Sequence, residues 1–141
     1  MLNANGFNAY SYKSILQPLG FNTIALDMRG HGMSNLPIDI HNLKNWNIFR
    51  DDIIEFFDRY IKNPVVLAGH SYGAVSGILA MPEIKNKVTG FVGFDPVLLP
   101  WPARLFSHFS WFREIAKQKL PVAKHAGRRK YKFESFEAAF D

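Results

Sequence analysis

The sequence contains no cysteine. Disulfides, thiolate metal sites and cysteine nucleophiles are therefore excluded, and we expect a reducing, cytoplasmic location. No apolar run approaches the roughly 20 residues that a membrane-spanning helix needs. The first residues lack the basic and apolar regions of a secretory signal, so none is expected. Acidic residues are scarce: 12 Asp and Glu stand against 17 Lys and Arg, which leaves a formal charge of +5.

Much of the positive charge lies near the end of the chain. The basic residues there are Lys117, Lys119, Lys124, Arg128, Arg129, Lys130 and Lys132. A basic segment of this kind can bind nucleic acid or an anionic surface. No nucleic-acid-binding motif accompanies it, so we favour a solvated helical face and expect no nucleic-acid partner. Hydrophobic residues make up 48% of the chain, which indicates a globular protein with a real core.

Helical spacing and short apolar runs alternate along the first two thirds of the chain. The pattern predicts a loop over 2–10, helices over 14–19, 46–61 and 72–81, strands over 21–26, 65–68 and 88–94, and a long loop over 28–45. Pro82 is expected to end the third helix. This alternation indicates an α/β fold with a parallel sheet, and unbroken apolar strands indicate that helices cover both faces. Function is then expected in the loops after the strands, at 27–34, 69–73 and 95–100.

One of these loops reads Gly69-His70-Ser71-Tyr72-Gly73. It follows an apolar strand and opens a helix rich in small residues, which is the setting of a nucleophile elbow. The turn is so tight that its serine takes strained backbone angles, and side chains two positions away would strike neighbouring backbone. The alternative is a serine that caps the helix. That alternative does not explain the glycines on both sides, so we interpret Ser71 as a nucleophile.

Three blocks of sequence resemble the α/β-hydrolase superfamily, specifically its cap-bearing serine hydrolases. They are Asn3-Ala4-Asn5-Gly6-Phe7, Asp27-Met28-Arg29-Gly30-His31-Gly32-Met33-Ser34 and the elbow. The first is similar to the family's oxyanion loop, with Asn3 in place of the usual His. Asp95-Pro96 is similar to the point where many members enter the cap. The resemblance implies a partial α/β-hydrolase fold, with a core over 1–100 and part of a helical cap over 101–141.

The resemblance also implies a site and a chemistry. Ser71 would attack an acyl carbonyl, and the backbone N–H groups of Asn5 and Tyr72 would bind the oxyanion. The substrate would be a small molecule with an ester, thioester, lactone or amide, or a carbon–carbon bond next to a carbonyl. No cofactor and no metal are implied. His31 is not the family's catalytic histidine, so we expect a structural turn that Asp27 and Arg29 hold beside the site.

The remaining members of a catalytic triad are harder to place. Asp95 follows a strand and is the possible acid. His108 lies in an aromatic helical segment, and His125 lies among cationic residues that lower a histidine's basicity. Neither follows a strand that could hold it over the elbow, so we expect both to be cap residues.

Only Met1 and Leu2 precede the oxyanion loop, where the resemblance requires a strand between those ending at Asp27 and Ala68. Without it the two strands cannot pair at the usual spacing of about 4.8 Å, and the sheet would have a central gap with exposed apolar edges. We therefore expect part of a longer hydrolase or a degraded gene product, with poor stability and little activity alone.

A second interpretation is a non-catalytic binding protein built on the same fold. Its interaction surface would be the aromatic residues that follow the last predicted strand: Trp101, Phe106, Phe109, Trp111 and Phe112. We prefer a cap over an acyl pocket as the role of this segment.

Overall fold

The computed structural model describes residues 1–39, 43, 45–98 and 134–135. Met1–Leu98 form one compact unit. Its elements are α1 (Lys13–Leu16), α2 (Asn47–Tyr60), β1 (Val65–His70), α3 (Tyr72–Ile84) and β2 (Val88–Phe94), with short 3₁₀ turns at Ala9–Tyr12, Gln17–Leu19 and Lys85–Lys87. The cap predicted over 101–141 lies outside the described residues except for Glu134 and Ser135.

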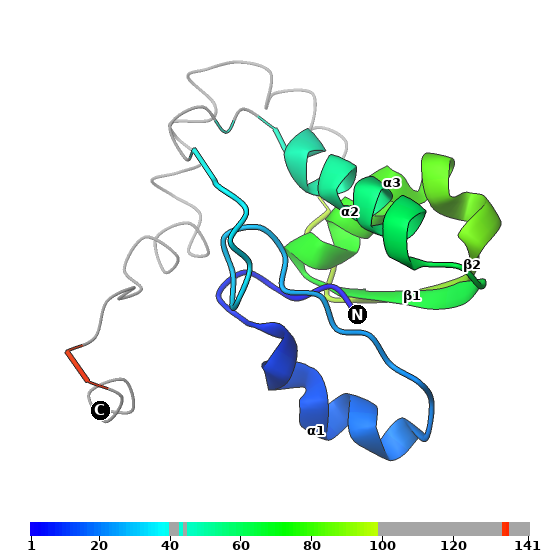
Figure 1. The fold of residues 1–141 in the computed structure, drawn as a ribbon, viewed down its shortest axis with the longest axis horizontal. Coiled ribbons are helices and arrows are strands. Elements are labelled where there is room, and N and C mark those ends of the chain that lie inside the picture. The colour runs from blue at the N-terminus through cyan, green and yellow to red at the C-terminus, as the bar shows by residue number, and fades with distance from the viewer. Residues whose placement is uncertain (40–42, 44, 99–133, 136–141) are drawn as a thin grey trace. The chain divides into compact units, whose positions relative to one another are not determined.

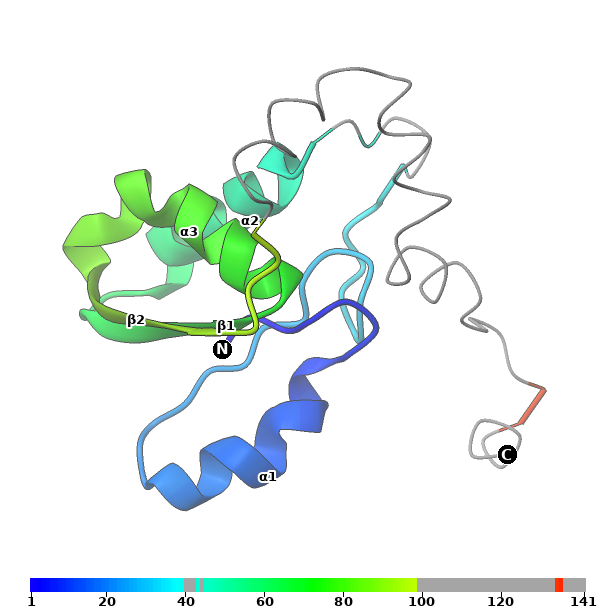
Figure 2. The ribbon, with the colours of Figure 1, turned by 180° about the vertical axis from the view of Figure 1, so that it is seen from behind.

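β1 and β2 form a parallel pair, as the alternation of elements predicted. Leu67 pairs with Phe91 and His70 with Phe94, so the two strands end side by side. Figures 1 and 2 show α2 and α3 on one side of this pair and α1 on the other. The parallel pair with flanking helices confirms an α/β fold. No helix among the described residues is long and apolar enough to cross a membrane.

α2 and α3 enclose the core of the unit. In α2 the buried residues Phe49, Ile53 and Phe57 recur every four positions and therefore lie on one face. The helix begins and ends within one residue of the predicted bounds. The hydrophobic core of the unit comprises the buried residues Leu2, Met28, Phe49, Ile53, Phe57, Ile61, Leu67, Tyr72, Ala80 and Ile84.

α3 continues past Pro82, so the predicted end of this helix is wrong. Pro82 lies only two residues before Ile84, the last residue of α3. A proline this close to the end removes one helical hydrogen bond, whereas continuing the helix buries Ile84, which is 2% exposed. Burial of an isoleucine therefore outweighs the lost bond.

The strand predicted over 21–26 is wrong for all but its last residue. Leu26 makes a parallel bridge to Leu2, and residues 21–25 have no strand structure. Phe21 and Ile24 are exposed rather than buried. Extended chain becomes a strand only when a neighbouring backbone accepts its hydrogen bonds, and here Met1 and Leu2 supply that neighbour only at the end of the segment.

The predicted gap in the sheet is bridged at Leu2. This residue makes parallel bridges to both Leu26 and Gly69, so it lies between the two segments. Its N–H donates to the Ala68 carbonyl at 2.8 Å, and its carbonyl accepts the His70 N–H at 3.1 Å. Leu2 thereby joins the 3–7 loop directly to the end of β1.

α1 lies on the other side of the strand pair (Figure 1) but leaves that face largely exposed, so the prediction that helices cover both faces of the sheet is wrong for the described residues. Val66, Val92 and Phe94 alternate onto the face opposite α3, and they are 62%, 43% and 51% exposed. The side chains on the other face of the strands, among them Leu67 and Phe91, pack into the core beneath α3. One covered face is sufficient to hold β1, β2 and α3 together at the elbow.

Candidate active site

Ser71 occupies the sharp bend between β1 and α3. Its backbone angles are φ 53° and ψ −120°, a region that residues other than glycine rarely adopt. Its N–H donates to the Phe94 carbonyl at 2.8 Å, and its carbonyl accepts the Val75 N–H at 3.2 Å. The strained residue is thus held by the neighbouring strand on one side and by the first turn of α3 on the other. The predicted strand, bend and helix are all present.

The two glycines of the motif lie where a side chain would meet backbone. A Cβ added at Gly69 would lie 2.6 Å from the Ala74 Cα, and one added at Gly73 would lie 2.5 Å from the Asn3 carbonyl oxygen. Both distances are far below van der Waals contact, and backbone atoms cannot move aside as a side chain can. Glycine at 69 lets the chain turn, whereas glycine at 73 lets the 3–7 loop lie against α3.

The Ser71 side chain makes no capping hydrogen bond to α3. The helix-capping interpretation of this serine is therefore wrong. The N–H groups in the first turn of a helix have no acceptor within that helix, and the helix dipole makes this end positive. Ser71 and the Tyr72 N–H consequently lie at a position that favours a developing negative charge.

Asn3 anchors the loop that resembles the oxyanion loop. Its side chain is 1% exposed, accepts the Met28 N–H at 2.9 Å, and donates to the carbonyls of Ala4 and Phe7 at 2.9 and 2.8 Å. A turn closes from the Phe7 N–H to the Ala4 carbonyl at 3.1 Å. One amide therefore holds both ends of the turn that carries Asn5. The sequence indicated only that this residue replaces a histidine.

Tyr12 joins the same loop to the elbow, a contact that sequence analysis missed. Its hydroxyl accepts the Ala4 N–H at 2.8 Å and lies 3.0 Å from Nδ1 of His70. The hydroxyl of Tyr12 therefore links Ala4 on the 3–7 loop to His70 at the end of β1. The Phe7 ring lies 5.8 Å from the His70 ring. No local pattern marks Tyr12, because its partners lie far away in sequence.

The turn over 27–34 is fixed as predicted by Asp27 and Arg29. The Asp27 carboxylate accepts the N–H groups of Ala9 at 2.6 Å and Met33 at 2.8 Å. Arg29 donates to both carboxylate oxygens of Asp52 at 2.8 and 2.6 Å, and this hydrogen bonding raises the pKa of its guanidinium. Asp27 therefore holds the turn to the segment before α1, and Arg29 holds it to α2.

Tyr72 is buried beside this turn. The residue is 7% exposed, and its ring stacks on His31 at 5.3 Å between ring centres and makes a T-shaped contact with Phe49 at 5.4 Å. Burial raises the pKa of its hydroxyl, so the phenol is neutral at physiological pH. The buried side chain packs between α2 and the 27–34 turn, and the backbone N–H of Tyr72 lies at the start of α3.

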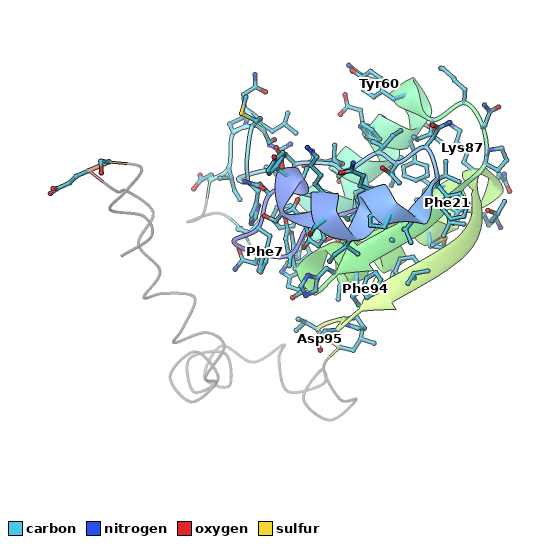
Figure 3. The ribbon with its side chains drawn as sticks, turned by 90° about the horizontal axis from the view of Figure 1, so that it is seen from below. Phe7, Phe21, Tyr60, Lys87, Phe94 and Asp95 are labelled. Carbon is cyan, nitrogen blue, oxygen red and sulfur yellow. The ribbon has the colours of Figure 1, made fainter. Side chains whose placement is uncertain are left out.

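Asp95 directly follows Phe94, the last residue of β2, whose carbonyl accepts the Ser71 N–H. Figure 3 shows Phe94 and Asp95 where the chain leaves β2. Asp95 has φ 43°, and it and Ser71 are the two residues other than glycine with positive φ in the described part of the chain. The described histidines, His31 and His70, are hydrogen-bonded to other residues, and His108 and His125 lie outside the described residues. Among described residues, no group of three or more His, Asp or Glu could hold a metal ion.

Comparison with known proteins agrees with this geometry. Residues 6–137 match a family described as serine aminopeptidase, S33. The chain is 28% identical over 138 residues to the AB hydrolase superfamily protein YfhM of Bacillus subtilis, which covers 92% of this chain and 48% of that protein. It is 33% identical over 75 residues to 2-(acetamidomethylene)succinate hydrolase of Mesorhizobium japonicum, or 53% of this chain and 26% of that protein.

A third relative is protein ABHD8 of Homo sapiens, 34% identical over 84 residues, which are 57% of this chain and 19% of that protein. The chain thus spans half or less of the length of each of these relatives. The matched region of the family includes the 27–34 turn, the elbow and Asp95. The chain therefore belongs to the hydrolase family described as serine aminopeptidase, S33, within the α/β-hydrolase superfamily.

Proposed function

We propose that Ser71 is the nucleophile of a hydrolase that cleaves an ester, thioester or similar acyl bond. The observation that carries this proposal is the strained backbone of Ser71 at the start of α3, with no capping bond from its side chain. Strain of this kind costs on the order of 1–3 kcal/mol and persists mainly where it serves function. A serine needed only to start a helix would adopt relaxed angles and bond to the helix N–H groups.

In the proposed reaction the Ser71 hydroxyl attacks the acyl carbonyl. The backbone N–H groups of Asn5 and Tyr72 bind the oxygen as it becomes negative, and water then releases the acyl group. Asn3 and Gly73 support this pairing, because one fixes the 3–7 loop and the other lets it approach α3 closely. A relative named for hydrolysis of 2-(acetamidomethylene)succinate supports hydrolysis as the reaction class.

We propose Asp95 as the acid of a triad, since it directly follows β2, whose last residue, Phe94, is hydrogen-bonded to Ser71. The histidine between them would come from outside the described residues, because His31 and His70 are bonded elsewhere. Loss of a triad histidine leaves only the residual catalysis of the oxyanion hole, roughly 10³–10⁴ over water. Covalent labelling of the serine needs only one reaction per chain, so it can be followed where repeated turnover is slow.

The test is labelling of the 141-residue chain with a fluorophosphonate, which the serine oxygen attacks with loss of fluoride. We expect one label, located at Ser71 by peptide mass spectrometry and lost in Ser71→Ala. Ser14→Ala is the matched control, since Ser14 is exposed on α1 and should not change the labelling. Label on Ser71→Ala equal to the parent would refute the proposal. Absence of both label and ester turnover would favour the non-catalytic interpretation.

A further inference from the structure

We propose that His31 is a positioning residue that sets the spacing of the two oxyanion donors. This inference rests on the proposed function, because it concerns the same Asn5 and Tyr72 N–H groups. It assigns a role to a histidine that sequence analysis placed only in a structural turn. The reason is that one imidazole ring contacts the side chains of both donor residues.

The contacts come from both ring nitrogens and from the ring face. Nε2 of His31 lies 3.2 Å from Oδ1 of Asn5, on the 3–7 loop. Nδ1 lies 3.2 Å from the Tyr72 hydroxyl and 3.1 Å from the Arg29 carbonyl. The His31 and Tyr72 rings also stack with an interplanar angle of 24°. The ring thus bridges the loop that carries one donor and the helix that carries the other.

The ring is attached to a rigid support. Its own backbone N–H donates to the Met28 carbonyl at 2.9 Å, and its carbonyl accepts the Ser34 N–H at 3.0 Å. Two residues of the turn fix it to its surroundings. The Asp27 carboxylate accepts the N–H groups of Ala9 and Met33, and Arg29 forms an ion pair with Asp52 on α2. A side chain on a fixed turn can hold two other elements in place, whereas one on a mobile loop cannot.

Tyr72 transmits the constraint to its backbone. Its ring stacks on His31 and makes T-shaped contacts with the rings of Trp46 and Phe49, with ring centres 6.3 and 5.4 Å away. A buried ring held on several sides leaves the first residue of α3 little freedom. Asn5, unlike Tyr72, is exposed. In the 3–7 loop, the restraint that we test is therefore the contact between the Asn5 side-chain amide and His31.

The spacing of the donors matters because oxyanion binding depends on distance. Donors must lie about 2.7–3.1 Å from the developing charge, and loss of one typically costs 10²–10³ in rate. A donor that is displaced rather than removed costs less. We therefore expect His31→Ala to lower the maximal labelling rate (kinact) of Ser71 by about tenfold, with the half-saturating fluorophosphonate concentration (KI) unchanged.

The matched control is Met33→Ala, since Met33 lies in the same turn and is 92% exposed. Two further variants, Asn5→Ala and Tyr72→Phe, remove the side-chain partners of His31 and keep both backbone donors. In double-mutant cycles each should add little to His31→Ala, because the contact is already lost. An unchanged kinact in His31→Ala, or additive effects in both cycles, would overturn the inference.

A second measurement separates this inference from the proposed function. Amide hydrogen exchange at Asn5 and Tyr72 should accelerate together in His31→Ala and stay unchanged in Met33→Ala. This result is expected whether or not Ser71 reacts with fluorophosphonate. If the parent chain is not labelled and the two amides still respond, the proposed function fails while the positioning contact stands. If the two amides do not respond to His31→Ala, the inference is wrong.

Discussion

Asn3 shows how much of this site depends on single polar side chains. Its amide is nearly fully buried and makes three hydrogen bonds, to Met28, Ala4 and Phe7. A buried amide that satisfies several backbone groups is worth more than one exposed bond, because each lost partner is left unsatisfied. Tyr12 and His31 act in the same way, each joining segments that are distant in sequence. The candidate site is therefore held by side-chain bonds between loops.

At this scale we predict the effect of removing the Asn3 amide. Asn3→Ala should lower the free energy of unfolding by about 1–3 kcal/mol, because the buried Met28 N–H loses its acceptor. Urea unfolding measures the change. Asn3→His, which restores one donor and one acceptor, should recover part of it. Asn22→Ala is an exposed control that should stay within about 0.5 kcal/mol of the parent. Equal unfolding of Asn3→Ala and Asn22→Ala would contradict the anchoring role.

The elements meet most closely where α3 begins. β1, the bend at Ser71 and the first turn of α3 form one continuous unit, and the 3–7 loop crosses it at Gly73. The backbone of Leu2 pairs with β1, and the carbonyl of Asn3 would lie 2.5 Å from a Cβ at Gly73. The 3–7 loop and Ser71 are thus positioned by the same two elements. Any change that separates α3 from the loop should affect both donors.

Gly73→Ala tests this contact between elements. Alanine gains at most about 1 kcal/mol of helix propensity over glycine, but its methyl group would press on backbone that cannot move aside. We expect a net loss of about 1–3 kcal/mol in the free energy of unfolding, with reduced labelling of Ser71. Gly90→Ala is the control, because its added methyl would lie 3.8 Å from the Val66 side chain. A Gly73→Ala chain as stable and as reactive as Gly90→Ala would show that the close approach is unimportant.

Across the whole described unit, Met1 and Leu2 connect two parts that would otherwise not pair. Leu2 lies between Leu26 and Gly69, and the Met1 carbonyl accepts the Leu26 N–H at 3.0 Å. The opposite face of the sheet remains apolar and exposed at Val66, Val92 and Phe94. Poor stability of the isolated chain stays a prediction that follows from this exposed surface.

The amino group of Met1 predicts a pH dependence in the 141-residue chain made with a free terminus. The group donates to the Ile24 carbonyl at 2.6 Å, and burial lowers its pKa from 8.0 to about 6. Between these values the unfolded chain binds more protons than the folded chain. The free energy of unfolding should therefore rise from pH 6 to pH 8, by up to about 2 kcal/mol.

The control for this prediction is the same chain with an acetylated terminus, which keeps an N–H donor but cannot titrate. Histidines contribute equally to both chains, so the difference between them isolates the amino group. Urea unfolding at pH 6, 7 and 8 measures it. If the acetylated chain shows the same rise with pH, burial of the amino group is not the cause.

The amino-acid sequence by itself determined the elbow and the elements beside it. Residues 65–94 carry their own signals: an apolar run, two glycines around a serine, a helix of small residues and a second apolar run. These patterns act over a few residues, so the order of strand, bend, helix and strand follows from them. α2 was equally clear, because Phe49, Ile53 and Phe57 mark one face.

Only the tertiary structure decided which distant segments meet. Residues 21–25 have an apolar pattern but no strand, because a strand exists only beside a partner, and Leu2 reaches Leu26 alone. α3 passes Pro82 because Ile84 has a core to enter. The links of Asn3 to Met28 and of His31 to Asn5 join residues that are far apart along the chain. No local pattern contains such pairs, since they arise only when packing brings separate loops to one edge of the sheet.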